Sequence, residues 1–197
     1  MQFWHIRHTM ISRISGAIAV LALGLLAQVG PATAQGLPGS KLIDAILDNN
    51  LAIARHEVLN GSSVNQRDGD GVPAIVLAAQ HNRYYLIDFL LQNRANVNAT
   101  TKETGETAMI AAADEGNIDI VEQLIDAGAD FNQEDDRGET AMIKAVRKGH
   151  LRIVRTLADA GADLNHTDYT GRSALAHAEE SRQRGIMRFL ESRNATY

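Results

Sequence analysis

An apolar residue followed by asparagine recurs four times along this chain at almost constant spacing. The four pairs are Val64-Asn65, Val97-Asn98, Phe131-Asn132 and Leu164-Asn165. They lie 33, 34 and 33 residues apart. A period of about 33 residues is typical of stacked repeats, in which each unit covers the apolar face of its neighbour. The spacing therefore predicts an array of similar units, and it favours binding over catalysis.

Within one unit the apolar residues follow the period of an α-helix. Ile120, Val121, Leu124 and Ile125 form one stripe, and polar residues occupy the other side of the same segment. A single unit cannot bury such a stripe, so successive units must stack. We therefore predict helices that pack between units as well as within them.

Small polar residues and glycines mark the expected ends of the helices. Hydroxyl groups that can cap free N–H groups stand before three of the runs, at Thr107, Thr140 and Ser173. Gly116 and Gly149 follow two of the runs, at positions where a left-handed residue ends a helix. These signals predict helices that begin just after the hydroxyl residue and end at the glycine.

The order of these features resembles the ankyrin repeat. From Gly105 the chain reads Gly-Glu-Thr-Ala-Met-Ile-Ala-Ala-Ala-Asp-Glu-Gly-Asn-Ile-Asp-Ile-Val-Glu-Gln-Leu-Ile-Asp-Ala-Gly-Ala-Asp-Phe-Asn, and from Gly138 it nearly repeats itself. The resemblance implies an all-α repeat solenoid of helix-turn-helix units joined by β-hairpin-like loops, with a more polar cap at each end. We expect an ankyrin repeat domain over 40–197, with units at about 40–67, 68–101, 102–134, 135–167 and 168–197.

The sequence departs from the family pattern at several positions. Ala108 and Ala141 replace the usual proline, which removes some rigidity from the helix starts. Arg94 stands where the next unit has Gly128, so we expect a reshaped or strained turn that costs about 1 kcal/mol. The single 34-residue step places one extra residue in the loop 99–104. We expect regular stacking to be most disturbed there.

Residues 1–34 differ from the rest of the chain. They contain two arginines and no acid, and residues 14–29 are apolar or small except for one serine and one glutamine. The triplet Ala32-Thr33-Ala34 follows. This form predicts a secretory signal peptide cleaved after Ala34, with a short linker at 35–39. A retained membrane anchor is the alternative, although the apolar run is shorter than the ~20 residues that span a bilayer. Met10 is a second possible start.

Charge and cysteine content narrow the class of protein. The formal net charge is −5, and removing residues 1–34 moves it to −7, because two arginines and no acid are lost. An acidic chain is poorly suited to bind nucleic acid. Cysteine is absent, so disulfides, thiolate chemistry and a lipid-bearing cysteine are excluded. The chain resembles small periplasmic ankyrin proteins of Gram-negative bacteria, and we expect a monomer in the periplasm without a membrane segment after cleavage.

By the resemblance, partners contact the hairpin tips and the exposed face of the first helix in each unit. Carried onto this sequence, the acidic positions are Glu103, Glu106, Asp114 and Glu115. The basic positions are Arg137, Lys144, Arg147 and Lys148, and Tyr169, Arg172 and His177 extend the surface into the last unit. Because the last three basic positions of unit 4 lie at i, i+3 and i+4, they predict a positive ridge beside a negative one. The alternative is a solvated surface on which neighbouring units attract each other.

The favoured function is recognition of a protein partner, with no catalytic residues, cofactor or metal. His56-Glu57 begins like a zinc helix motif but has no second histidine at Asn60. An enzyme is therefore disfavoured, while an exported effector or toxin-neutralising protein acting on a foreign target is the main alternative. The segment 68–71 begins like a calcium loop but lacks the closing glutamate, so we predict a hairpin turn.

Two of the repeating asparagines also belong to Asn-x-Ser/Thr triplets, the acceptor motif for glycosylation. These are Asn98 and Asn165. We predict that their side chains tie adjacent turns together instead. The triplet at Asn194 is left open.

Overall fold

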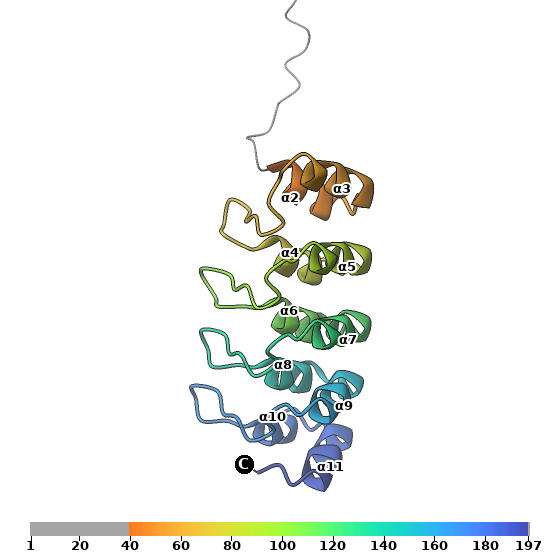
Figure 1. Ribbon diagram of the computed structural model, residues 1–197. Helices are drawn as coiled ribbons and strands as arrows, with labels where there is room; N and C mark the ends of the chain where they lie inside the picture. The colour runs from red at the N-terminus through yellow and green to blue at the C-terminus, as the bar shows by residue number, and fades with distance from the viewer. Residues whose placement is uncertain (1–39, 197) are drawn as a thin grey trace, which may run out of the picture. The chain divides into compact units, whose positions relative to one another are not determined.

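The computed structural model describes residues 40–196, which form a stack of five helix pairs (Figure 1). The predicted signal peptide and linker lie outside the described residues. The first helices of the units are α2 (Ser40–Leu47), α4 (Ala74–Gln80), α6 (Ala108–Glu115), α8 (Ala141–Lys148) and α10 (Ala174–Glu180). The second helices are α3 (Leu51–Leu59), α5 (Tyr84–Gln92), α7 (Ile118–Asp126), α9 (Leu151–Asp159) and α11 (Arg184–Ser192).

Successive units bury each other's apolar stripes. The first helices contact one another along one layer and the second helices along another. In α7, Ile120, Val121 and Leu124 are fully buried and Ile125 is half-buried, as their spacing predicts. Burying each such side chain stabilises the fold by about 1.5–3 kcal/mol. The predicted all-helical solenoid is confirmed for the described residues, which contain isolated β-bridges and no named strand.

The repeating asparagines connect each unit to the next. The Oδ1 atom of Asn65 accepts a hydrogen bond from the backbone N–H of Asn96 at 2.8 Å. The three equivalent bonds, all 2.8–2.9 Å long, run from the N–H groups of Asp130, Asp163 and Thr196 to Asn98, Asn132 and Asn165 respectively. The prediction that Asn98 and Asn165 tie adjacent turns together is therefore confirmed. The regular spacing of the asparagines in the sequence thus corresponds to a ladder of hydrogen bonds from backbone N–H groups to asparagine side chains along the stack.

Most of the predicted helix ends are confirmed. The Thr107 and Ser173 side chains accept hydrogen bonds from the third residue of their helices, and Gly116 ends α6 in the left-handed conformation with φ +80°. Thr140 is an exception. It precedes α8, but its hydroxyl makes no capping bond, and its buried Oγ1 has no partner among the described residues. Arg94 adopts φ +64°, the conformation that its position in place of a glycine predicts.

Hairpin loops project from the inner side of the stack, on the left of Figure 1. Isolated bridges join Arg67 to Pro73 and Thr167 to Ser173, six residues apart in each case, whereas the bridge in unit 3 joins Thr100 to Thr107. The extra residue of unit 3 therefore lies within its hairpin, as predicted. The hairpin turn predicted at 68–71 is also present, since Asp68 Oδ1 accepts the N–H groups of residues 70 and 72.

Adjacent hairpin tips are bonded to each other. The backbone N–H of Asp136 donates to the Thr104 carbonyl at 2.9 Å, and the N–H of Tyr169 donates to the Arg137 carbonyl at 3.0 Å. Gly138 makes the second contact possible, because a Cβ there would lie 2.5 Å from the Tyr169 ring. The inner surface is thus a continuous strip of hairpin tips and first helices. None of the helices within residues 40–196 has the length and apolar character needed to cross a bilayer.

Candidate functional site

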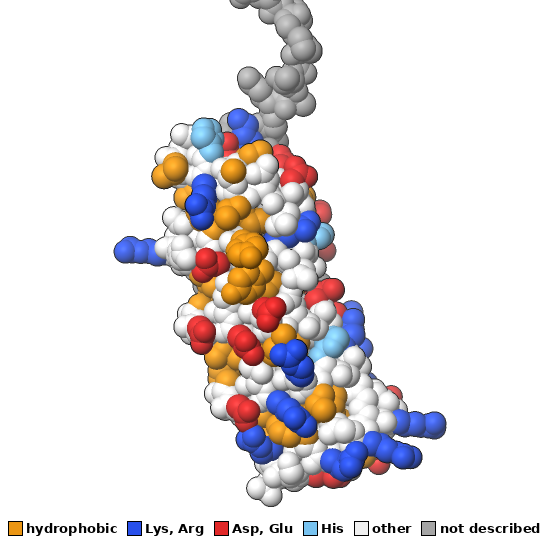
Figure 2. All heavy atoms as spheres, turned by 90° about the vertical axis from the view of Figure 1, so that its right-hand side faces the viewer, with side chains coloured by type: hydrophobic (Ala, Val, Ile, Leu, Met, Phe, Trp, Pro, Cys, Tyr) orange, Lys and Arg blue, Asp and Glu red, His pale blue; other side chains and the backbone are white. Residues whose placement is uncertain are grey.

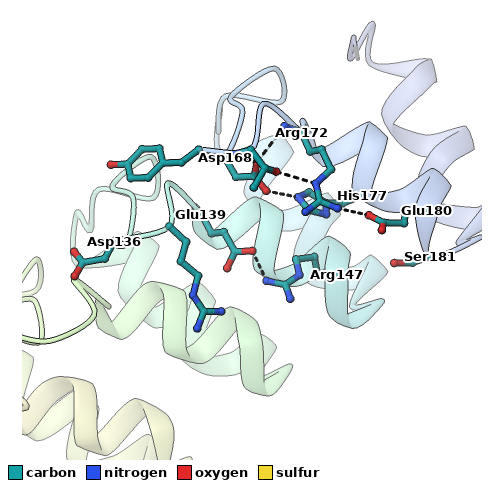
Figure 3. Close-up of a pocket in the computed structure, with 11 residues that line it drawn as sticks. Asp136, Glu139, Arg147, Asp168, Arg172, His177, Glu180 and Ser181 are labelled. Carbon is teal, nitrogen blue, oxygen red and sulfur yellow. Dashed lines mark hydrogen bonds and ion pairs between the residues drawn. The ribbon is translucent and has the colours of Figure 1, made fainter.

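A groove of about 710 Å³ lies on the inner surface between units 4 and 5 (Figure 3). Its walls come from the two hairpins and from the first helices α8 and α10. Four predicted site residues of units 4 and 5 line it: Arg137, Arg147, Tyr169 and Arg172. His177 lines it too, but it is buried at 5% exposure. The prediction that His177 extends the exposed surface into the last unit is therefore wrong.

A buried aspartate organises the hairpin on each side of the groove. Asp135 Oδ1 accepts the N–H groups of Arg137 and Glu139, each at 2.9 Å. In the next unit Asp168 Oδ1 accepts those of Thr170 and Arg172, at 2.8 and 3.1 Å. Each carboxylate holds the hairpin in shape with one oxygen and turns the other toward α8 or α10. Sequence reasoning missed both residues, although their 33-residue spacing marks them as equivalent.

The second oxygen of Asp168 meets His177 on α10. His177 Nε2 and Asp168 Oδ2 are 2.8 Å apart, and both side chains are almost fully buried. Burial acts to raise the pKa of Asp168, but hydrogen bonds from Thr170, the Arg172 backbone and His177 outweigh it. The net result is a pKa well below the ordinary value of 3.8, so this carboxylate is ionised at neutral pH. Its charge fixes the hairpin of unit 5 on its own first helix.

Lys144 lies between two buried acids in unit 4. Its Nζ is 3.0 Å from Asp135 Oδ2 and 2.6 Å from Glu139 Oε2, and its side chain is only 12% exposed. Burial acts to lower the pKa of Lys144, yet hydrogen bonds to Glu139 and Asp135 raise it above its ordinary value. Arg147 also pairs with Glu139 (Figure 3). Glu139 thus holds two cations of α8.

These pairs correct the predicted positive ridge. Lys144, Arg147 and Lys148 do share one side of α8, but each is paired with a carboxylate of this chain. Lys148 reaches across to Asp114 of unit 3, with Nζ and Oδ2 2.8 Å apart. The alternative in which neighbouring units attract each other describes the Lys148–Asp114 pair, whereas Lys144 and Arg147 pair with acids of their own unit. The spacing of residues along one helix shows that they share a side, but it does not show the acids that the hairpin and the preceding unit bring to that side.

The groups that stay open to a partner lie at the rim of the groove. Tyr169 is 67% exposed and donates its hydroxyl hydrogen bond to Glu134 at 2.8 Å. Arg137 is exposed and forms no ion pair among the described residues. Arg172 pairs with Glu180 at 2.7 Å across the mouth of the groove. An aromatic ring and a guanidinium without an acidic partner are therefore displayed together.

The acidic positions of unit 3 lie beside this groove. Glu103 and Glu106 line a smaller hollow of about 370 Å³ between the hairpins of units 3 and 4, together with Arg137 and Lys144. Glu106 accepts a hydrogen bond from Gln80 at 2.7 Å, and burial raises its pKa. Glu115 and Glu103 are exposed, Glu106 and Asp114 half-buried. The structure thus brings the acidic and basic halves of the predicted surface onto the same inner strip.

One cluster in the groove has the side chains of a metal site. Glu139, Asp168 and His177 each offer a ligand atom, and these atoms lie within 4.8 Å of one another. Each of the three side chains already has a partner within the chain, however, because His177 bonds to Asp168 and Glu139 pairs with Lys144 and Arg147. Two cations next to a metal would repel it. The residues fit a structural network better than a metal site.

Comparison with known proteins decides the family. The sequence matches the family described as ankyrin repeats (three copies) over residues 42–135 and again over 113–197. The chain belongs to the ankyrin repeat family. The resemblance to the ankyrin repeat is thereby confirmed, and members of this family act as protein–protein interaction modules. The groove between units 4 and 5 accordingly lies on the inner surface of an ankyrin array.

Individual relatives share the array and differ in the rest of their chains. Alpha-latrocrustotoxin-Lt1a of Latrodectus tredecimguttatus is 33% identical over 105 residues, which are 53% of this chain and 7% of the toxin. A putative palmitoyltransferase ZDHHC13 of Danio rerio is 31% identical over 138 residues, 68% of this chain and 20% of that protein. The putative ankyrin repeat protein L38 of Acanthamoeba polyphaga mimivirus is 32% identical over 91 residues, 46% of this chain and 43% of that one. This chain thus matches less than half of the length of each relative.

Proposed function

We propose that this ankyrin array is a non-enzymatic protein-binding module of the periplasm, and that its partner occupies the groove between units 4 and 5. One observation carries the proposal: Tyr169 and Arg137 stand exposed at the rim of a groove in which Arg147, Arg172 and the buried acids are paired within the chain. Tyrosine and arginine are the residue types that most often dominate the energy of protein interfaces. The neighbouring ion pairs keep the rim rigid, which lowers the entropy lost on binding.

The charges of the groove define the chemistry of the partner. Arg137 offers a planar guanidinium that can bind a carboxylate through two hydrogen bonds. The ring of Tyr169 offers an apolar face at the rim of the same groove. A partner segment with an acidic side chain near an apolar or aromatic one would satisfy both. Buried acids in the groove are each engaged by a cation or a histidine of the chain, which supports binding over acid–base catalysis.

The periplasmic location rests on the leader features of residues 1–34. An exported ankyrin array would act on proteins of the cell envelope, in the manner of an adaptor or accessory protein. Fractionation of the native host combined with N-terminal sequencing tests this part separately. The proposal requires a periplasmic product that begins at Gln35, and a cytoplasmic product that keeps residues 1–34 contradicts it.

Affinity capture from the native periplasm tests the site. The wild-type chain, Arg137→Glu and Tyr169→Ala are used as baits, with Arg55→Glu as the matched control, because Arg55 is exposed on α3 of the first unit. Charge reversal at Lys144 or Arg147 is avoided, since both residues hold buried acids of the fold. The proposal predicts a partner that the wild type and Arg55→Glu retain and the two rim variants lose. A partner retained equally by all four baits would exclude this groove.

A further inference from the structure

The outer surface of the array consists of the second helices, and its charge changes sign along the stack. Figure 2 shows a hydrophobic patch near the middle of this face, acidic side chains beside it, and Lys and Arg side chains towards the C-terminal end. On α7 the second and fifth residues are Asp119 and Glu122, whereas on α9 they are Arg152 and Arg155. All four side chains are exposed. Equivalent positions of adjacent units thus carry opposite charge.

Each half of this face keeps its sign of charge one unit further outward. The fifth residue of α5 is Asp88, and the fifth residue of α11 is Arg188. None of Asp119, Glu122, Arg152 and Arg188 takes part in an ion pair within residues 40–196. This face therefore differs from the inner side of α8, where Lys144, Arg147 and Lys148 are each paired with an acid of this chain. Its charges are available to a binding partner.

Aromatic side chains accompany the charges on both halves of this face. Tyr84 and Tyr85 are 41% and 71% exposed, and their rings meet edge to face at 5.4 Å. They line a groove of about 510 Å³ together with four residues of α7: Asp119, Glu122, Gln123 and Asp126. The side-chain oxygen of Gln123 is buried without a hydrogen-bond partner in the described part of the chain. Open rings and carboxylates together suit a surface that presents guanidinium groups.

The basic half of the face shows how this chain pairs aromatic rings with arginine. The guanidinium of Arg155 lies 5.6 Å from the centre of the Phe189 ring, and that of Arg193 lies 5.2 Å from it. Both distances suit a cation–π interaction. The tyrosine pair on α5 has exposed rings beside acids but no arginine stacked on it in the described structure. The arginine side chains of the basic half are therefore complementary to the tyrosine rings and carboxylates of the acidic half.

We propose that two copies of this chain associate back to back through their outer helices, with the order of units reversed. A two-fold axis parallel to the helices, between α7 and α9, keeps the helix direction and places α7 of one copy against α9 of the other. Equivalent positions then meet: Asp119 faces Arg152 and Glu122 faces Arg155. Symmetry forms each pair twice, because such an interface uses the same patch on both copies.

The next helices outward are complementary in the same arrangement. When α5 of one copy faces α11 of the other, Asp88 lies opposite Arg188, and Tyr85 lies opposite Gly185. Glycine leaves room for the exposed tyrosine ring. A second copy satisfies the acidic and the basic half at once, whereas an unrelated basic partner satisfies only the acidic half. The inner groove stays open in this dimer, so the inference stands independently of the proposed function.

Native mass as a function of concentration tests the proposal on the purified mature protein. Light scattering after gel filtration is compared with the mass of the same chain measured under denaturing conditions. The acid-reversed variant carries Asp119→Arg and Glu122→Arg, and the base-reversed variant carries Arg152→Glu and Arg155→Glu. Asp44→Arg with Arg55→Glu reverses two exposed charges of the first unit as the control. Circular dichroism verifies that each variant is folded.

The proposal predicts that the native mass of the wild type and of the control rises from one chain towards two with concentration. Each reversed variant alone stays at one chain, and an equimolar mixture of the two returns to twice that mass, because the reversed charges complement each other across the interface. Raising the salt from about 0.05 M to about 0.5 M should weaken the wild-type dimer, since exposed charges are screened.

Three results would overturn the proposal. The first is a wild type that stays at the mass of one chain, the monomer that the sequence predicts, up to about 1 mM. The second is a pair of reversed variants that dimerise as strongly as the wild type. The third is a mixture of folded variants that fails to associate. Arg155 also stacks on Phe189, so its reversal changes more than charge. The single substitution Arg152→Glu leaves that stacking intact and is therefore measured as well.

Discussion

Lys144 and Lys148 offer a direct test of how this surface uses charge, because they are the same residue type one turn apart on α8. Lys144 is 12% exposed and bonds two buried acids, whereas Lys148 is 52% exposed and reaches Asp114, which is 28% exposed. The prediction compares Lys144→Met with Lys148→Met. Methionine keeps the length of the side chain and removes only the charge and its hydrogen bonds.

The two substitutions should differ severalfold in cost. Removing one partner of a buried ion pair leaves an unpaired charge and destabilises a protein by about 3–5 kcal/mol. We expect the lower end, about 3 kcal/mol, for Lys144→Met, because Glu139 keeps Arg147 as a second cation. An exposed pair contributes only about 0–1 kcal/mol, so Lys148→Met should cost no more than that.

The assay is urea unfolding at pH 7, followed by circular dichroism, with equal slopes for the compared variants. Adding Glu139→Gln to Lys144→Met should recover part of the loss, because it removes the uncompensated charge. Since the pKa of Lys144 is raised, its contribution should be constant below pH 10.5 and fall only as the pH rises through the folded pKa above that value. An equal loss in the free energy of unfolding for the two substitutions would refute the claim that Lys144 stabilises the fold through its buried ion pairs.

Three further predictions concern the backbone and the buried acid. Gly138→Ala should lower the stability measured by thermal unfolding by clearly more than Gly128→Ala. Both glycines have positive φ, so each substitution carries an αL strain of about 1–2 kcal/mol, but only at Gly138 would the added Cβ also meet Tyr169. Arg94→Gly should stabilise by about 0.5–1 kcal/mol in the same assay, because it relieves that strain at φ +64°. Asp168 has a folded pKa below its unfolded value of 3.8, so its contribution is complete above pH 3.8 and lost as the pH falls through the folded pKa. Asp168→Asn should accordingly flatten the acid limb of a stability–pH profile and lower stability at pH 7, and an unchanged acid limb would contradict the assignment.

The architecture of the repeats could be predicted from the sequence because the signals are local and repeated. The period of the asparagines, the helical stripe at Ile120–Ile125 and the caps at Thr107 and Gly116 each depend on a few neighbouring residues. The structure confirms them through the bonds and burial that these residue types favour. A repeat array is favourable to such reasoning, since every unit tests the interpretation of the previous one.

The pairing of the charges could not be predicted in the same way. The spacing of Lys144, Arg147 and Lys148 shows that they share a side of a helix, but the acids that meet them come from a hairpin and from unit 3. Glu139 is buried at 4% exposure, and the tip of the next hairpin, at Tyr169, packs against the neighbouring Gly138. Such burial depends on the contact between units. It decides whether a charge serves the fold or remains open to a partner.

Photo-crosslinking in the native host tests whether a protein occupies the groove between units 4 and 5, because it reads out contact at one position without disturbing the ion pairs. A photoreactive phenylalanine analogue replaces Tyr169 at the groove rim, and in a parallel strain it replaces Arg55 on the outer face of the first unit. We expect irradiation to join position 169 to one discrete protein and to give no such product at position 55. A discrete product at position 55 together with none at position 169 would contradict a protein-binding groove between units 4 and 5.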